Sequence, residues 1–142
     1  MRLREFQSYL SDKRIDAALF TSLGMEADPN FFYFTQYRGH GALIIPRSGK
    51  PTLLVSKMEQ ERAQKSRIRH IVPLEKKRLY ESVNAHLKSV KTLGVDFSSL
   101  TLLSSKALRK SIKGKKIGDI SRKVEDLRLI KTGEESAFLK TS

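Results

Sequence analysis

Apolar positions along the chain repeat with two different periods, and these periods predict alternating helices and strands. Leu3, Phe6 and Leu10 recur at the i, i+3, i+7 spacing of one helix face, with mainly polar residues between them. This spacing predicts an amphipathic helix that ends near residues 12–13. The mostly apolar stretch at residues 15–20 then predicts a buried strand.

The next part of the chain is marked by turn residues and by aromatic side chains. An Asp-Pro-Asn sequence at residues 28–30 predicts a turn, because proline fixes φ and the flanking side chains can bond their own backbone. It leads into the aromatic group at residues 31–34, which we expect to pack in the core and on the sheet rather than to form a binding platform. Residues 42–45 and 51–55 then predict a β-hairpin.

Five further elements follow in the second half of the chain. We expect a helix at residues 57–65, a strand at 68–72, a helix at 79–90, a strand at 92–96 and a helix at 100–112. The basic run from Gly114 to Gly118 predicts a turn. Together the elements predict an α/β domain with a central mixed sheet, because a hairpin gives an antiparallel pair and helical crossovers give parallel pairs.

Composition narrows the class of protein. The 142 residues suit one domain, and 39% hydrophobic with 30% charged residues fits a folded chain. The absence of cysteine excludes a disulfide framework, a thiolate metal site and a cysteine nucleophile. No apolar run reaches the ~20 residues of a membrane helix, and the first residues lack the apolar segment of a secretory signal. We therefore expect a cytoplasmic location and no membrane partner.

The charge of the chain is strongly basic and unevenly distributed. The net charge is +13, and residues 57–123 contain 18 basic and 6 acidic side chains, which accounts for +12 of it. A basic surface is the electrostatic footprint of nucleic-acid-binding proteins. These basic side chains are scattered through amphipathic segments without aromatic residues between them for base stacking. We therefore favour a solvated basic surface over a nucleic-acid site.

Two aspartates beside predicted strands raise a rival possibility. Asp16 opens the strand at residues 15–20, and Asp96 closes the strand at residues 92–96. A ribonuclease-H-like nuclease gathers carboxylates near strand ends around Mg²⁺. In a parallel arrangement these two carboxylates would lie at opposite edges of the sheet, and no third acidic partner is evident. We therefore expect no convergent nuclease site.

Other side chains that could bind a metal or a phosphate are few. The three histidines fall in separate predicted elements without the spacing of metal ligands: His40, His70 and His86. We expect His70 and His86 to be exposed to solvent. The sequence Gly39-His40-Gly41 lacks the third glycine and the following helix of a phosphate-binding loop. Its glycines permit backbone conformations or close approaches that larger residues forbid.

The last residues predict the start of another helix. Thr132 and Glu135 form a capping-box pattern, and the positive end of the helix dipole favours Glu134 and Glu135 in its first turn. The few residues that remain make a helix that is marginal without a partner surface. We therefore expect a domain at residues 1–126 and, at residues 127–142, a linker and first helical turns that lead into a missing domain.

Three stretches together match an ordered set of motifs. Residues 28–37 read Asp-Pro-Asn-Phe-Phe-Tyr-Phe-Thr-Gln-Tyr, residues 93–96 read Leu-Gly-Val-Asp, and residues 127–135 read Leu-Arg-Leu-Ile-Lys-Thr-Gly-Glu-Glu. They resemble the Pro-Asn-aromatic-Tyr-Leu-Thr-Gly segment, the Ile-Gly-Val-Asp strand end and the Leu-Arg-x-Ile-Lys-Ser-x-x-Glu junction of the creatinase/prolidase family. Phe34 stands where Leu is usual, and Gln36 stands where Gly is usual. The resemblance is to the N-terminal domain of these proline-directed aminopeptidases and dipeptidases.

This resemblance implies a fold, a function and a division of labour. It implies three layers, α/β/α, around a mixed sheet in a ribonuclease-H-like layout. In the family, two aspartates, one histidine and two glutamates hold two divalent metals in a downstream pita-bread catalytic domain, and none of those motifs can be placed on residues 1–142. The chain would then bind no metal or other cofactor and be a non-catalytic domain of an Xaa-Pro peptidase, which serves homodimerisation and shapes the cleft for proline-containing peptides.

The resemblance also points to one loop. In the family the corresponding loop lies near the mouth of the active site, often that of the partner subunit. Arg38 or His40 would then contact the free carboxylate of the substrate or shape its pocket, with Tyr37 beside them. The other interpretation is a flexible loop with a solvated arginine and a half-buried histidine. At the level of the whole chain, the alternative is a basic nucleic-acid-binding or ribonuclease-H-like nuclease domain.

Overall fold

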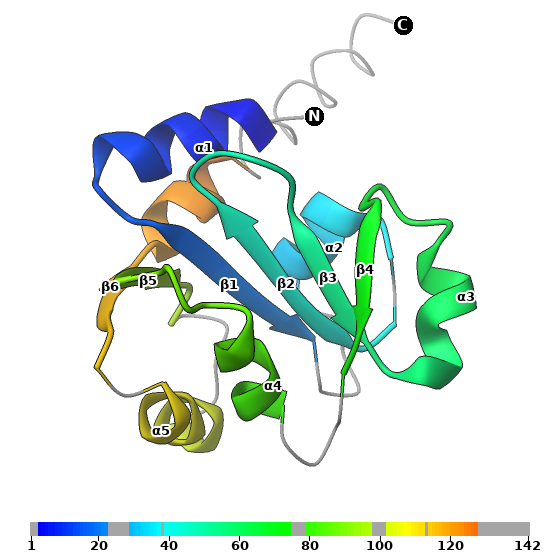
Figure 1. Cartoon of the computed structure of the whole chain (residues 1–142). Coiled ribbons are helices and arrows are strands. Elements are labelled where there is room, and N and C mark those ends of the chain that lie inside the picture. Colours follow the sequence, from blue (N-terminus) through cyan, green and yellow to red (C-terminus); the bar gives the residue numbers. More distant parts are fainter. Residues whose placement is uncertain are drawn as a thin grey trace, which may run out of the picture.

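A mixed sheet forms the centre of the structure, a computed structural model that describes residues 3–22, 29–37, 39–74, 79–97, 102–112 and 114–127 (Figure 1). The six strands are β1 (Ala17–Ser22), β2 (Gly41–Pro46), β3 (Thr52–Val55), β4 (His70–Pro73), β5 (Thr92–Val95) and β6 (Lys116–Asp119). Their order in the sheet is β4-β3-β2-β1-β5-β6. β2 is antiparallel to both of its neighbours, whereas the other neighbouring pairs are parallel. The predicted hairpin and mixed sheet are confirmed.

Helices cover both faces of this sheet. They are α1 (Leu3–Asp12), α2 (Pro29–Thr35), α3 (Gln60–Ala63), α4 (Leu79–Ala85) and α5 (Leu102–Ser111), together with the 3-10 helix η1 (Lys57–Glu59) and a helical stretch at residues 121–127. Figure 1 shows α2 behind the sheet and α4 in front of it, with α5 packed beside α4. The predicted three layers are confirmed. Within the described part of the chain, no helix combines the length and the apolar character needed to cross a membrane.

The hydrophobic core is divided into two clusters by the alternation of side chains along the strands. In β1, Ala18 and Phe20 face the cluster that contains α1, α2, α3 and the helical stretch at residues 121–127. Ala17 and Leu19 face the cluster that contains α4 and α5. Successive side chains of a strand point to opposite faces, and here both faces are covered. This is why β1 is apolar over four consecutive positions instead of alternating between apolar and polar residues.

The first helix ends where its sequence predicts. Arg14 adopts a left-handed φ of +58°. The backbone N–H of Arg14 donates to the carbonyl of Ser11 (3.1 Å), and the N–H of Ile15 donates to the carbonyl of Leu10 (2.8 Å). This pair of bonds is a Schellman motif, which satisfies carbonyl groups left free at a helix end. The predicted end near residues 12–13 is confirmed.

The segment around the aromatic group differs from its prediction. Pro29 and Asn30 begin α2 and do not form a separate turn, because proline suits the first turn of a helix, where its missing N–H has no partner to lose. Phe31, Tyr33 and Phe34 are buried in the cluster that contains α1 and α2. They are core residues, as expected, but they reach the core from a helix.

β6 is a second difference from the sequence analysis. Gly114 adopts a φ of +83°, as a turn requires, but the predicted turn is too long. A strand begins at Lys116 and pairs in parallel with β5, with Gly118 opposite Gly94. The strand lies at the edge of the sheet, where exposed lysines such as Lys116 are common because they discourage pairing with other chains. The basic residues of β6 therefore made it resemble a turn in the sequence.

The helix at residues 79–90 is shorter than its apolar spacing predicts. α4 ends at Ala85, although Leu87 beyond it is fully buried. The ammonium group of Lys115 donates to the carbonyls of Leu87 and Val90, at 2.6 Å each. Lys115 therefore satisfies backbone carbonyls of the segment after the helix, where no helical N–H groups are available to them.

The last residues that the structure describes pack into the core. Residues 121–127 are helical, and Leu127 is 1% exposed in the cluster that contains α1 and α2. Residues 128–142 lie outside the described residues, and with them the capping-box pattern of Thr132 and Glu135. The division between a domain at 1–126 and a linker at 127–142 stays a prediction.

Candidate functional site

The loop between α2 and β2 contains the site residues that the sequence analysis selected. α2 ends at Thr35, whose buried hydroxyl donates to the carbonyl of Phe31 (2.8 Å) and accepts the N–H of Tyr37 (3.0 Å). Gln36 stands between Thr35 and Tyr37 with a left-handed φ of +58°. The N–H of Arg67 donates to the carbonyl of Thr35 (2.9 Å). These bonds fix the point at which the loop leaves the helix.

Tyr37 anchors the loop to the core. Its side chain is 6% exposed, and its ring packs against Phe31 with the two centroids 6.4 Å apart. Its hydroxyl donates to Oε1 of Glu59 at 2.8 Å. Burial, reinforced by this hydrogen bond to a carboxylate, raises the pKa of Tyr37 to about 12. The phenol is therefore neutral at physiological pH and acts as a hydrogen-bond donor.

Gly39 and His40 lie directly on this anchor. A Cβ atom on Gly39 would stand 2.0 Å from the hydroxyl oxygen of Tyr37 and 2.6 Å from Oε1 of Glu59, closer than any side chain tolerates. A larger residue here would have to displace the Tyr37 hydroxyl and the Glu59 carboxylate. The backbone N–H of His40 donates to the same Oε1 at 3.3 Å, while the residue itself is exposed. Arg38 lies outside the described residues, so its predicted role stays a prediction.

Glu59 is the residue of this site that the sequence analysis missed. It ends η1, directly after β3, and its other oxygen, Oε2, accepts the hydroxyl of Ser56 at 3.3 Å. A signal was present in the sequence, since Ser56 and Glu59 have the spacing of a capping box. The structure uses the glutamate differently, because its carboxylate binds the loop from residue 37 to residue 40.

Asp16, the first carboxylate of the rival nuclease site, lies at the N-terminal end of β1. Its Oδ2 accepts the N–H groups of Thr92 (3.0 Å) and Lys91 (2.9 Å), and its Oδ1 lies 3.8 Å from the guanidinium of Arg47. The hydrogen bonds from Thr92 and Lys91 lower the pKa of Asp16 below its ordinary value. Asp16 thus joins the start of β1 to the start of β5.

Asp96, the second carboxylate, lies at the opposite end of the parallel strands β1 and β5. It follows β5, is 2% exposed and accepts a hydrogen bond from the side-chain amide of Asn30. Because β1 and β5 are parallel, the start of β1 and the end of β5 lie at opposite ends of the two strands. Asp16 and Asp96 therefore do not converge on a shared metal ion, as the sequence analysis expected.

The histidines are separated in the same way. His70 is exposed on β4, where its Nδ1 lies 3.1 Å from the hydroxyl of Thr52, and His86 is exposed after α4. Both are exposed, as predicted. Among the described residues, no three side chains of histidine, cysteine, aspartate or glutamate gather closely enough to hold a metal ion. The family resemblance places the metal pair in a downstream domain, and the described residues offer no cluster that could hold it.

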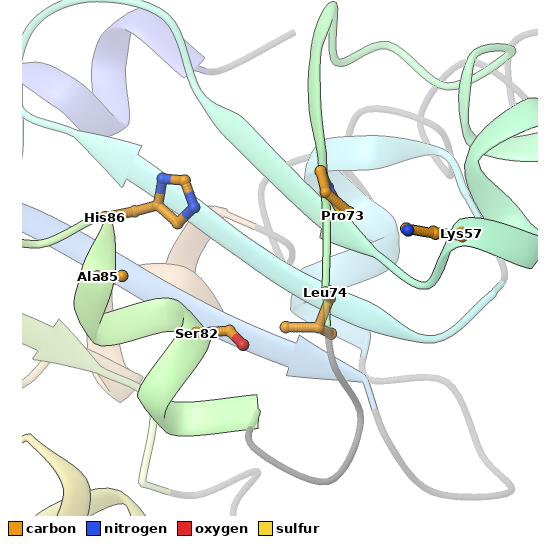
Figure 2. A pocket seen from close by; sticks show the side chains of 6 residues that line it. All are labelled: Lys57, Pro73, Leu74, Ser82, Ala85 and His86. Atoms are coloured by element: carbon orange, nitrogen blue, oxygen red, sulfur yellow. The ribbon is translucent and has the colours of Figure 1, made fainter.

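A surface pocket of about 400 Å³ lies elsewhere on the molecule (Figure 2). Ser82, Ala85 and His86 line it from α4 and the turn that follows. Figure 2 shows Pro73, the last residue of β4, and Leu74 after it facing them, with Lys57 pointing toward Pro73 from the other side. These six residues line the pocket. Neither Tyr37 nor His40 is among them, so the pocket and the loop are separate features.

Sequence comparison relates the chain to a known domain. The family model described as the Creatinase/Prolidase N-terminal domain matches residues 2–130. An uncharacterized peptidase of Staphylococcus epidermidis is 28% identical over 149 residues, an alignment that covers 98% of this chain and 39% of the relative. The chain therefore spans 39% of the length of the curated protein that it matches.

Solved structures share the fold at low sequence identity. The X-Pro aminopeptidase from Thermotoga maritima MSB8 matches with a TM-score of 0.79 at 16% identity, over 89% of this chain and 35% of that one. The prolidase from Pyrococcus horikoshii OT3 matches with a TM-score of 0.71 at 23% identity, over 89% and 34%. The N-terminal domain of the cytoplasmic peptidase PepQ from Mycobacterium tuberculosis H37Rv matches with a TM-score of 0.74 at 20% identity, over 89% and 97%. The predicted fold class is confirmed.

Proposed function

We propose, from the premise that the chain belongs to the creatinase/prolidase N-terminal domain family, that it is the non-catalytic N-terminal domain of a metal-dependent Xaa-Pro peptidase. The observation that carries the proposal is the family match over residues 2–130. Two further observations support it: the 28% identical relative is a peptidase of which this chain spans 39%, and two structures with the same fold are a prolidase and an X-Pro aminopeptidase.

In this proposal the chain contributes no metal ligand and no reacting group. Two divalent metal ions would be held by a catalytic domain outside these 142 residues, where they would activate a water molecule and polarise the scissile carbonyl. The part of the chain that the structure describes offers no cluster of metal-ligating side chains. The work of this domain would then be to pack on the catalytic domain, to contribute to a homodimer in the cytoplasm and to bound the substrate cleft.

The loop at residues 37–40 is the part of the domain that we propose to bound the cleft. Its base is fixed through the buried Tyr37, while His40 is exposed to solvent. An exposed residue on a firmly held loop can meet a ligand without a large entropic cost, and loops carry function disproportionately. Arg38 and His40 would contact the free carboxylate of a peptide or shape the pocket for its proline.

Peptide hydrolysis by the complete protein tests the proposal. We expect hydrolysis of an Xaa-Pro dipeptide, little hydrolysis of the matched Xaa-Ala dipeptide, and loss of activity when a chelator removes the metals. The isolated chain of 142 residues should cleave neither peptide. A complete protein that cleaves no Xaa-Pro bond after loading with divalent metals would refute the proposed function, and cleavage by the isolated chain would refute the non-catalytic role.

The basic surface does not lead us to a nucleic-acid function. The two aspartates that could have served a nuclease, Asp16 and Asp96, lie at opposite ends of the parallel strands β1 and β5. Binding of DNA or RNA by the isolated chain, with an affinity that falls steeply as salt rises, would reopen that alternative.

A further inference from the structure

The carboxylate of Glu59 is the meeting point of the loop and the sheet. Its Oε1 accepts two hydrogen bonds from the loop, one from the hydroxyl of Tyr37 (2.8 Å) and one from the backbone N–H of His40 (3.3 Å). Its Oε2 accepts the hydroxyl of Ser56 (3.3 Å). Hydrogen bonds to a charged acceptor are stronger than those between neutral groups. One side chain therefore binds both ends of the loop from residue 37 to residue 40.

Glu59 itself stands on a rigid support. It follows β3, in which Leu53, Leu54 and Val55 are all fully buried. The backbone N–H of Glu59 donates to the carbonyl of Ser56 (3.0 Å), which closes the turn of η1 directly after the strand. A side chain that rises from a rigid element holds its partners more precisely than one on a mobile loop. The turn of η1 thus places Glu59 four residues after a buried strand.

Gly39 lies close to the side chains of Tyr37 and Glu59. Any Cβ at residue 39 would collide with the Tyr37 hydroxyl and with the Glu59 carboxylate. The backbone of Gly39 therefore lies directly against the hydrogen bond between these two side chains. Tyr37, Gly39 and His40 therefore lie around one carboxylate oxygen of Glu59.

We propose that Glu59 is a positioning residue for the substrate cleft: it holds Tyr37 through the tyrosine hydroxyl and, through the backbone N–H of His40, sets the place of the His40 side chain. The effect of Glu59 on catalysis rests on the proposed function, whereas its effect on the position of His40 does not. Glu59 touches no reacting atom, so its loss should change substrate binding more than the chemical step.

Amide hydrogen exchange measured by NMR on the chain of 142 residues tests the structural content. In Glu59→Ala we expect exchange at the His40 N–H to rise by about tenfold or more, because a hydrogen bond to a charged acceptor is lost. Exchange at Leu43 and Ile45 in β2 should stay unchanged, which shows that the sheet is intact. Glu61→Ala is the matched control, because it removes an exposed glutamate two residues away and should leave His40 protected.

Two gentler variants keep the test decisive if Glu59→Ala does not fold. Glu59→Gln retains an acceptor oxygen and should give intermediate protection of His40. Tyr37→Phe leaves the carboxylate and removes one of the two hydrogen bonds that the described loop residues donate to it, so it should loosen Gly39 and His40 together. Unchanged protection of His40 in all folded variants, or an equal loss in Glu61→Ala, would overturn the assignment.

Kinetics of the complete protein test the consequence for the cleft. For an Xaa-Pro dipeptide, Glu59→Ala should raise KM by about threefold to tenfold with a smaller change in kcat, Glu59→Gln should recover part of the loss, and Glu61→Ala should behave as wild type. A fall in kcat alone, or unchanged constants, would refute the role in the cleft. If the wild-type protein cleaves no such peptide, the proposed function fails with that role, while the exchange data still decide whether Glu59 sets the loop.

Discussion

Gln36 ends α2 in a backbone conformation that glycine adopts more easily. Its φ is +58°, and the family segment that residues 28–37 resemble has glycine at this position. A residue with a Cβ is disfavoured there because Cβ approaches the carbonyl oxygen. The amide of Gln36 compensates in part, since its Nε2 lies 3.4 Å from the carbonyls of Phe32 and Tyr33.

This conformation leads to a prediction about stability. Gln36→Gly should raise the free energy of unfolding by about 0.5–1 kcal/mol, because the relief of strain exceeds the added entropy of the unfolded chain. Gln36→Ala keeps the strain and loses the amide contacts, so it should lower the free energy of unfolding. Urea unfolding of the three proteins measures both changes. A destabilised Gln36→Gly would show that the amide contacts outweigh the strain.

The hydroxyl of Tyr37 gives a prediction about pH. Its pKa in the folded protein is about 12, above the value near 10 of an unfolded tyrosine. The folded state therefore holds this proton more tightly, and the stability that results is complete below about pH 10 and is lost as pH rises toward 12.

Absorbance of tyrosinate measures this titration. In the wild-type protein, deprotonation attributable to Tyr37 should be delayed to about pH 12, and Tyr37→Phe should remove that late step. Tyr9 also has a raised pKa, because of burial and then the nearby Asp119, so the difference between the two proteins is the quantity to follow. A difference spectrum that titrates near pH 10 would contradict the buried hydrogen bond to Glu59.

Most elements could be predicted from local patterns, and the exceptions have physical causes. The spacing of Leu3, Phe6 and Leu10 is sufficient for α1, because one face of a helix must be apolar. The helix α2 was not predicted because its aromatic residues favour strands on their own, and tertiary burial overrides that preference. The strand β6 was not predicted because its pairing with β5, and not its composition, makes it a strand.

The candidate site could be predicted only in part for a similar reason. The loop residues Tyr37 and His40 were selected through the family resemblance, and the only local signal is the pair of glycines beside His40. Glu59 lies 22 residues from Tyr37 and 19 from His40 along the chain. No local pattern reports a contact of that separation, and the capping-box spacing of Glu59 suggested only a role within its own helix.

Asp16 links two parallel strands, and its loss should be measurable at the level of these elements. Asp16→Ala should lower the free energy of unfolding by about 1–2 kcal/mol, because the N–H groups of Lys91 and Thr92 lose a charged acceptor. Asp16→Asn keeps an acceptor and should lose less. Thermal or urea unfolding measures the two changes, and equal stability of all three proteins would contradict this link.

The same link should depend on pH in a defined direction. Because the pKa of Asp16 is lowered by folding, its stabilisation is present above the ordinary pKa of aspartate and is lost as pH falls through the lowered value. The difference in stability between the wild type and Asp16→Asn should therefore shrink in strong acid. A difference that stays constant down to acid unfolding would exclude the carboxylate as its source.

At the scale of the whole molecule, the sheet supplies a rigid frame and one loop supplies an exposed residue. Helices on both faces bury the strands, and Glu59 of η1 accepts hydrogen bonds from Tyr37 and His40 of the loop. Within the described residues no cluster of side chains could hold a metal ion. In the proposed function, this domain bounds the substrate cleft and catalysis belongs to another domain.

The most direct test of this account is the steady-state hydrolysis of an Xaa-Pro dipeptide by the complete protein with Arg38→Ala or His40→Ala, beside the wild type. The account predicts an active wild-type enzyme and a KM raised by about tenfold in at least one variant, with kcat changed less, because the loop contacts the peptide and not the reacting atoms. Unchanged kinetic constants in both variants would contradict it and would reduce the loop to packing.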